Sequence, residues 1–310
     1  MRLVFMGTPE FAIPSLERLI ADGHRIVGVV TGPDRPSGRG QRFTPSPVKE
    51  LAQSHGLSIL TPEDLKDRVF LEALREMRPD LIVVVAFRIL PPEVLAIPSK
   101  GTVNLHASLL PKYRGAAPIN WAIINGEAET GVTTFFIDRG VDTGDIILQK
   151  TVGIGEEETA GELHDRLKVI GADLLSRTVS CIARGDFPRR PQSLEGAIKA
   201  PKLKKDDGRI DWQKSAQQIK YLIRGTNPYP GAFTHRKGSV LKIHRAVVIS
   251  VESSGRPGEV IRADRKDGIT VATGRGLLYL SEVQPEGRRP MSSAEYVRGY
   301  DVREGEVWGK

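Results

Sequence analysis

Residues 81–86, which read Leu-Ile-Val-Val-Val-Ala, constrain the fold of this chain more than any other feature of its sequence. A short run without a polar residue is typical of a strand that is covered on both faces, and such strands lie in the centre of parallel sheets. The longest apolar run, residues 81–87, is also far shorter than the roughly 20 residues that a membrane helix needs. The sequence therefore predicts a buried parallel strand and no membrane span.

Strand-like and helix-like patterns alternate through the first half of the chain. Residues 3–6 predict a first strand, and apolar residues at helical spacing follow it. Further strands are expected at 25–31, 57–60, 81–86, 130–137 and 146–152, and further helices at 62–77 and 159–184. Strands that alternate with helices build a sheet with helices on both faces. We expect a Rossmann-like, doubly wound and mostly parallel α/β domain over residues 1–188.

The composition changes after Asp186. Prolines and basic residues are frequent over 189–206, which predicts a basic linker. A short helix at 216–224 follows, and then five strand-like runs are separated by turns that contain glycine. This pattern predicts a second domain over 207–310, a small β-barrel for which the oligonucleotide-binding (OB) barrel is one candidate. Two domains also suit a length of 310 residues.

Positive charge is concentrated in the C-terminal part. Residues 199–310 hold 22 Lys and Arg against 13 Asp and Glu, a net charge of +9, whereas the preceding 198 residues have a net charge of −2. Such a domain suits a polyanionic partner, for example a nucleic acid or an anionic membrane, although a solvated basic surface explains the charge equally well. The single Cys181 cannot form an internal disulfide, and the first residues lack the pattern of a secretory signal. We expect a cytoplasmic protein.

Several common kinds of site are missing from the sequence. It contains neither the phosphate-binding G-x-x-x-x-G-K-[ST] motif nor the dinucleotide-binding G-x-G-x-x-G motif. The six histidines and the cysteine do not have zinc-ligand spacing, and there is no G-x-S-x-G motif. Metal chemistry and serine-nucleophile chemistry are therefore not expected.

The segment Val103-Asn104-Leu105-His106 offers a different chemistry. In a strand, Asn104 and His106 share one face while Leu105 faces the core. The turn-rich segment 140–145 could bring Asp142 to the same sheet edge. An amide donor, an imidazole and a carboxylate suit acyl transfer. The same residues also fit a purely structural interpretation. In it Asn104 caps a turn, His106 is a residue at the sheet edge held by hydrogen bonds, and Asp142 only forms a turn.

The sequence around these residues favours the interpretation that they catalyse acyl transfer. Residues 101–121, GTVNLHASLLPKYRGAAPINW, and the later GVDTGD resemble the active-site signature of the folate-dependent formyltransferases. The segment GTPEF at 7–11, the loop at 32–49 and NPYPGA at 227–232 resemble the members of this family that act on tRNA. The resemblance extends over nearly the whole chain. One departure is at residues 86–91, where relatives usually carry a glycine after the aromatic residue.

This resemblance implies an enzyme that transfers the formyl group of 10-formyltetrahydrofolate to the α-amine of methionine on initiator tRNA. It implies that Asn104, His106 and Asp142 are catalytic and that Ser108, Leu109, Leu110 and Pro111 line the folate site. Arg39, in the matching Gly-Arg-Gly, would recognise the tRNA together with Arg35 and Arg42. The basic C-terminal barrel would hold the tRNA backbone, with His235, Arg236, Lys237 and Lys242 as plausible contacts. A monomer that needs no metal is expected.

Three alternatives stay open at this point. A formyltransferase that acts on a nucleotide-sugar amine also carries a barrel-like second domain, but the basic loop and the basic C-terminal part suit tRNA better. A catalytically idle RNA-binding relative would not need Asn104, His106 and Asp142 to be intact. A hydrolase that releases formate from the same folate would do so without an acceptor amine.

Overall fold

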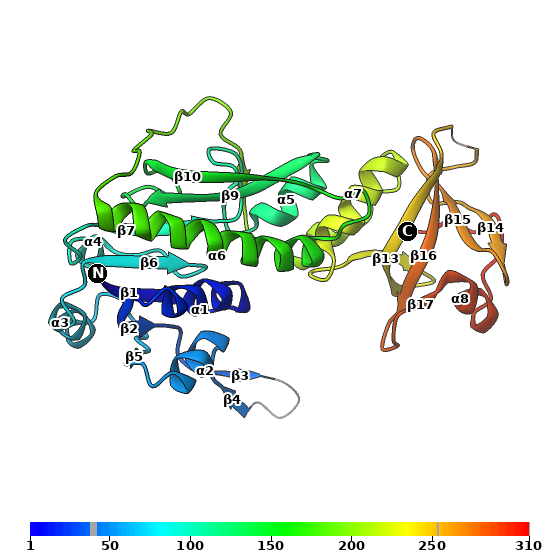
Figure 1. Cartoon of the computed structure of the whole chain (residues 1–310). Coiled ribbons are helices and arrows are strands. Elements are labelled where there is room, and N and C mark those ends of the chain that lie inside the picture. Colours follow the sequence, from blue (N-terminus) through cyan, green and yellow to red (C-terminus); the bar gives the residue numbers. More distant parts are fainter. Residues whose placement is uncertain (38–41, 253, 310) are drawn as a thin grey trace. The chain divides into compact units, whose positions relative to one another are not determined.

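The apolar run at 81–85 forms β6 (Leu81–Val85), which is buried along its length inside a seven-stranded sheet (Figure 1). The computed structural model describes residues 1–37, 42–252 and 254–309. The strand order is β10-β9-β7-β6-β1-β2-β5, with parallel pairing from β7 through β6 and β1 to β5 and antiparallel pairing of β7 with β9. The other strands are β1 (Arg2–Gly7), β2 (Arg25–Val30), β5 (Ile59–Leu60), β7 (Thr102–His106), β9 (Glu129–Phe136) and β10 (Ile146–Gly153). The predicted mostly parallel sheet is confirmed.

Helices cover both faces of this sheet. Val4, Met6, Ile82 and Val84 pack on one face in the same apolar cluster as side chains of α3 and α4. On the opposite face, Gly171 of α6 lies against the Leu105 side chain, so a side chain at position 171 would collide with it. The helices of this part are α1 (Ile13–Ala21), α2 (Pro47–Ser54), α3 (Arg68–Glu76), α4 (Pro92–Leu95) and α6 (Ala160–Arg184). Ser176 of α6 donates a hydrogen bond to Asp22 at the end of α1, which places these two helices together.

The helix expected at 62–77 is shorter in the structure. It begins only at Arg68, because the Asp67 side chain caps it by accepting the Phe70 N–H at 3.0 Å. Just before it, the Asp64 carboxylate accepts the Lys66 N–H at 2.9 Å. Aspartates that bind nearby backbone N–H groups compete with the helix and favour turns and caps. The expected helix was therefore about one and a half turns too long at its start.

Two segments expected as irregular contain short strands. In the predicted loop 32–49, β3 (Arg35–Ser37) and β4 (Arg42–Thr44) pair in antiparallel fashion. In the predicted linker 189–206, Arg190 pairs with Ile146, and β11 (Lys199–Ala200) pairs in parallel with β8 (Arg114–Gly115). Residues 189–200 are thus attached to the sheet-containing part of the chain.

The chain divides into two compact units whose boundaries interrupt the sequence. The N-terminal unit comprises Met1–Ala116, Thr130–Gly153 and His164–Ala200, and the C-terminal unit comprises Ala117–Glu129, Ile154–Leu163 and Pro201–Lys310. The C-terminal unit therefore includes α5 (Pro118–Ile124), which precedes the expected boundary at 188 by many residues. It packs on α7 (Ala216–Thr226), where the Asn120 side chain donates to the Gly225 carbonyl at 2.7 Å.

The C-terminal unit is built on an antiparallel sheet of order β12-β13-β16-β15-β14, with β17 paired to β16. Its strands are β12 (Ala232–Arg236), β13 (Ser239–Ser250), β14 (Val260–Asp264), β15 (Gly268–Ala272), β16 (Leu277–Pro285) and β17 (Met291–Ser292). The five expected strands are present, and α8 (Ser293–Gly299) follows them. The core of this unit includes Trp212, Ile223, Leu278 and Trp308. In the described part of the chain, no helix combines the length and the apolar character that a membrane crossing requires.

Candidate active site

The end of β7 presents Asn104 and His106 on one face of the parallel sheet. Val84 of β6 lies beside Asn104 in the parallel register and belongs to the cluster under α3 and α4, so Asn104 and His106 face that side. Leu105 points the opposite way, toward α6. This carboxyl end of the parallel strands is the edge where α/β sheets bind ligands.

The His106 side chain is only 6% exposed and has a neighbour at each ring nitrogen. Nε2 lies 2.8 Å from the Tyr113 carbonyl oxygen, and because a carbonyl can only accept, Nε2 is the donor. Nδ1 lies 3.7 Å from Oδ2 of Asp142. The same Oδ2 accepts the Gly115 N–H at 2.8 Å. The Asn104 side chain is half-buried and makes no hydrogen bond to the described residues.

The loop that carries Asp142 reaches this edge by an indirect route. β9 runs antiparallel to β7, so Phe136 at its end lies beside Val103, at the start of β7. The loop 137–145 must then return along β7 by three residues, roughly 10 Å at about 3.3 Å per residue, before Asp142 faces His106. Asp142 has a positive φ of 54°, which aspartate tolerates better than most residues. Gly144 passes so close to the Phe136 carbonyl that a Cβ there would lie 1.7 Å from its oxygen.

The segment 108–113 lies directly after β7 and is held by its own hydrogen bonds. The Ser108 hydroxyl donates to the Lys112 carbonyl at 2.6 Å, and the Ser108 carbonyl accepts from the Thr133 hydroxyl at 2.6 Å. Gln149 donates to the Leu110 carbonyl at 2.9 Å. Of the four expected folate-contacting residues, Ser108 and Leu110 are buried, whereas Leu109 and Pro111 are half-buried. Of these four residues, only Leu109 and Pro111 therefore expose side-chain surface that a ligand could contact.

The structure describes only some of the expected tRNA contacts, and these differ in their exposure. Arg35 is exposed on β3, Arg42 contributes its backbone to β4, and Arg39 lies outside the described residues. In the C-terminal unit, Lys237 is exposed while Arg236 is buried. The Arg236 guanidinium pairs with Glu306 at 2.9 Å and donates to the Tyr296 hydroxyl at 3.2 Å. Arg236 is thus occupied within the protein, which removes it from the plausible phosphate contacts.

Sequence reasoning did not find Arg114 and Gln192. The Gln192 side-chain amide donates to the Asp142 carbonyl at 3.0 Å and to the Gly144 carbonyl at 2.8 Å. Its oxygen accepts from Arg114 Nη2 at 2.7 Å. A lone glutamine in a segment rich in proline and basic residues gives no periodicity or motif from which this contact could be read.

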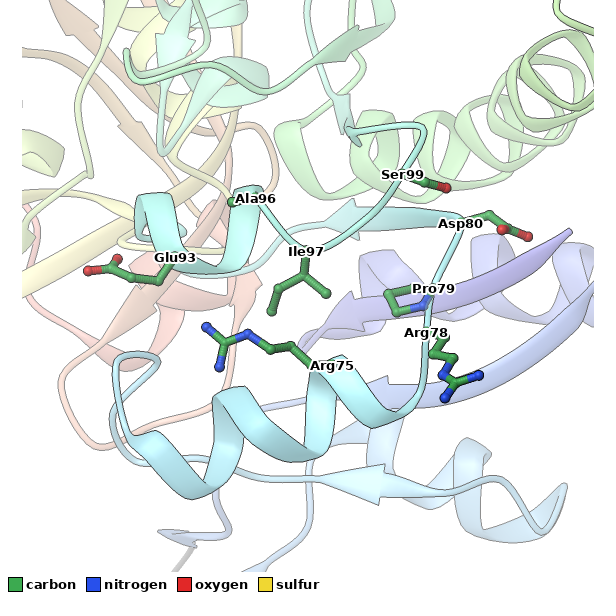
Figure 2. Close-up of a pocket in the computed structure, with 8 residues that line it drawn as sticks. All are labelled: Arg75, Arg78, Pro79, Asp80, Glu93, Ala96, Ile97 and Ser99. Carbon is green, nitrogen blue, oxygen red and sulfur yellow. The ribbon is translucent and has the colours of Figure 1, made fainter.

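A separate pocket of about 480 Å³ lies away from these residues (Figure 2). It is lined by Arg75, Arg78, Pro79, Asp80, Glu93, Ala96, Ile97 and Ser99. Asp80 and Ser99 precede β6 and β7, so the pocket lies at the amino ends of the parallel strands, opposite the edge that holds His106. Figure 2 shows the guanidinium groups of Arg75 and Arg78 pointing in different directions. Within residues 1–37, 42–252 and 254–309, no group of three or more His, Cys, Asp or Glu side chains could hold a metal ion.

Comparison with known proteins identifies the family of this chain. The family described as Formyl transferase matches residues 1–179, and the family described as Formyl transferase, C-terminal domain, matches residues 202–301. The methionyl-tRNA formyltransferase of Moorella thermoacetica is 51% identical over 310 residues, covering 100% of this chain and 99% of the relative. That of Alkaliphilus oremlandii is 49% identical over 311 residues and covers 100% of both chains.

A solved structure shares the fold. The N-formyltransferase from Helicobacter canadensis, in complex with folinic acid and dTDP-3-aminofucose, has a TM-score of 0.68 at 21% identity, over 90% of this chain and 98% of that chain. At this level of identity the likeness concerns the fold alone. The family matches and the full-length relatives carry the assignment: this chain belongs to the formyl transferase family, among relatives that are named methionyl-tRNA formyltransferase.

Proposed function

We propose that the chain transfers the formyl group of 10-formyltetrahydrofolate to the α-amine of methionine esterified to initiator tRNA. The observation that carries this proposal is the convergence of Asn104, His106 and Asp142 at the carboxyl end of the parallel sheet, in a chain about half identical to methionyl-tRNA formyltransferases along its length. In this proposal the enzyme works as a monomer in the cytoplasm.

The chemistry requires modest help from the protein. The reference pKa of an α-amine is near 8. An adjacent ester lowers it further, so part of the amine is neutral and nucleophilic at physiological pH. Its nitrogen attacks the formyl carbon, the bond from that carbon to the folate nitrogen breaks, and the proton lost by the amine is taken up by the departing nitrogen. Negative charge develops meanwhile on the formyl oxygen.

The candidate side chains match these needs. The half-buried Asn104 amide lies on the same face of β7 as His106 with its donors uncommitted to the described residues, so it can stabilise the developing oxyanion. The His106 ring is fixed by the Tyr113 carbonyl on one side and faces Asp142 on the other. With Nε2 donating to the Tyr113 carbonyl, Nδ1 is the ring nitrogen that can accept the amine proton and pass it to the leaving nitrogen, and the Asp142 carboxylate at 3.7 Å stabilises the imidazolium that forms in between.

The two substrates are assigned to different residues. The proposed folate site is lined by Ser108, Leu109, Leu110 and Pro111. Leu109 and Pro111 are half-buried and supply its accessible apolar surface. The proposed tRNA contacts of the N-terminal unit are Arg35 of β3, Arg42 of β4 and Arg39, which lies outside the described residues. The net charge of +9 over 199–310 supports a second set of contacts with the phosphate backbone.

The test is a formyl-transfer assay with the full chain, 10-formyltetrahydrofolate and initiator tRNA. We expect formylmethionine to be recovered from methionine-charged tRNA and no formylated product from the uncharged tRNA. Formate released at the same rate without an acceptor would instead identify a hydrolase. Faster formylation of a dTDP-linked amino sugar than of charged tRNA would identify a sugar N-formyltransferase.

A further inference from the structure

The side chain of Gln192 joins two parts of the candidate site that are far apart in sequence. Its Nε2 donates to the Asp142 carbonyl at 3.0 Å and to the Gly144 carbonyl at 2.8 Å. Its Oε1 accepts from Arg114 Nε at 3.2 Å and from Nη2 at 2.7 Å. Since arginine can only donate and backbone carbonyls can only accept, the orientation of the amide is fixed. All four of these hydrogen bonds need a glutamine amide in this one orientation.

These contacts close a ring through Asp142. Arg114 is followed directly by Gly115, whose N–H donates to Oδ2 of Asp142 at 2.8 Å. The Asp142 carboxylate is therefore tied to the Arg114–Gly115 peptide, while the Asp142 carbonyl is tied through Gln192 to the Arg114 side chain. The same residue is held at its main chain and at its side chain. This fixes both the position of the loop and the direction in which the carboxylate points.

The segment that supplies Gln192 is itself anchored. Arg190 and Ile146 exchange two backbone hydrogen bonds, at 2.8 and 3.0 Å. Further on, the Arg114 N–H donates to the Ile198 carbonyl at 2.9 Å, and β11 pairs with β8. Gln192 is thus presented from a segment bound on both sides of it, which makes it a fixed support for the loop.

The Asp142 loop needs such a support. It folds back from the far end of β7, Asp142 has a φ of 54°, and the neighbouring Val141 is 53% exposed. The His106 Nδ1 to Asp142 Oδ2 distance is 3.7 Å, so little direct bonding to the imidazole holds the carboxylate in place. We propose that Gln192, with Arg114, is a positioning residue that holds the Asp142 carboxylate opposite His106 for the formyl transfer. This inference rests on the proposed function of Asp142.

The expected kinetic signature is a loss of turnover with little change in substrate binding. Removing the support in Gln192→Ala should lower kcat about 10- to 100-fold, the range that a misplacement of about 1 Å can cause, with KM for both substrates nearly unchanged. Gln192→Glu keeps the size of the side chain and its attraction to Arg114 but replaces the donors with an oxygen that repels two carbonyls. We expect it to be at least as impaired as Gln192→Ala. Arg114→Lys, which loses the forked contact, should lie between these variants and the native enzyme.

The decisive experiment combines Gln192→Ala with Asp142→Ala and measures single-turnover rates in all four proteins. If Gln192 acts through Asp142, Gln192→Ala should cause no further loss in the Asp142→Ala background. Equal losses in both backgrounds, or an unchanged rate in the single variant, would overturn the inference. If Asp142→Ala itself kept the native rate, the proposed function of Asp142 would fail instead, so the two failures are distinguishable.

Two controls separate positioning from loss of fold. Gln53→Ala changes the same residue type at an exposed position of α2 and should leave kcat unchanged. Thermal unfolding of each variant shows which proteins are folded at the assay temperature. If Gln192→Ala proved unfolded there, the near-isosteric Gln192→Glu would decide: a folded variant with native kcat would contradict the inference.

Discussion

At the scale of single residues, the geometry assigns different tasks to the three candidate catalytic groups. Asn104 presents an amide that makes no hydrogen bond to the described residues, while the buried His106 lies between the Tyr113 carbonyl and the Asp142 carboxylate. An oxyanion donor and a proton-transfer pair act on the reacting atoms. None of the three groups is expected to contribute to tRNA affinity.

We therefore predict that Asn104→Ala lowers kcat about 10²- to 10³-fold and that His106→Ala lowers it about 10²- to 10⁴-fold. Asp142→Ala should show a comparable loss, and the losses should not add in the double variants, because the groups act as a unit. The measurements are single-turnover rates and the tRNA dissociation constant. A variant with a near-native rate at saturating substrates would show that its residue has no such role.

The sequence was informative about these residues to different degrees. The alternation in Val103-Asn104-Leu105-His106 predicted a shared face for Asn104 and His106, since a strand imposes that geometry by itself. The approach of Asp142 depends on a loop that folds back over the sheet, which no local pattern encodes. The contacts of Gln192 and Arg114 depend on the same tertiary arrangement, so they could only be found in the structure.

At the scale of elements, the central strands were predictable because strands that are buried on both faces consist of runs of apolar residues. The starting point of α3 was not predictable, because Asp64 and Asp67 bind backbone N–H groups that the expected helix would have used. The strands β3 and β4 were also missed. Each has only three residues, too few to show a periodicity.

The Asp142 loop is a tightly constrained element, and Gly144 provides a test of that constraint. A Cβ at Gly144 would lie 1.7 Å from the Phe136 carbonyl oxygen, so Gly144→Ala must displace the loop. We predict a loss of kcat of about 10²-fold together with a lower Tm, since overpacking costs about 1–3 kcal/mol. Gly153→Ala is the matched control, because no atom of the described part of the chain lies within 4 Å of a Cβ at that position. Native kinetics in Gly144→Ala would mean that the loop tolerates displacement.

The first turn of α6 carries a charge that should make stability depend on pH. The Glu162 carboxylate accepts the Thr159 N–H and the Thr159 hydroxyl, both at 2.8 Å, and pairs with Arg245 at 2.8 Å. The backbone hydrogen bond from Thr159, the hydrogen bond from Arg245 and that from the Thr159 hydroxyl lower the pKa of Glu162 to about 2. The folded protein therefore holds the proton less tightly than the unfolded chain, whose value is near 4.5.

This difference fixes the sign of the effect. The contribution of Glu162 to the free energy of unfolding is complete above about pH 4.5 and is lost as the pH falls toward about 2. Glu162→Gln keeps the capping hydrogen bonds but removes the charge. We predict a loss of at most about 1 kcal/mol at pH 7, because the side chain is half exposed, and a shallower fall in stability between pH 4.5 and 2. Urea unfolding across this pH range measures the free energy of unfolding of the native protein and of Glu162→Gln, and Glu17→Gln on α1 is the control. A pH dependence that is unchanged in Glu162→Gln would contradict this role of Glu162.

At the scale of the whole molecule, the two compact units do not follow the order of the sequence. Residues 117–129 belong to the C-terminal unit, where Ile119 and Ile123 of α5 are buried and Asn120 binds the Gly225 carbonyl of α7. Removing residues 207–310 would strip α7 from α5 and expose these side chains. Binding of tRNA is therefore better tested on the intact chain than on a truncated one.

The distribution of charge leads to a prediction for the intact chain. The net +9 of residues 199–310 should make tRNA binding release counterions, so the logarithm of the association constant should fall steeply and linearly with the logarithm of salt concentration. Lys237→Gln removes an exposed charge of the C-terminal unit and should reduce this slope by about one if Lys237 contacts a phosphate. Lys66→Gln, which removes an exposed charge of the N-terminal unit, should leave the slope unchanged. Binding of a reduced folate, measured over the same salt range, should depend on salt far less than binding of tRNA. A flat plot for tRNA would show that the basic C-terminal unit does not engage its phosphates.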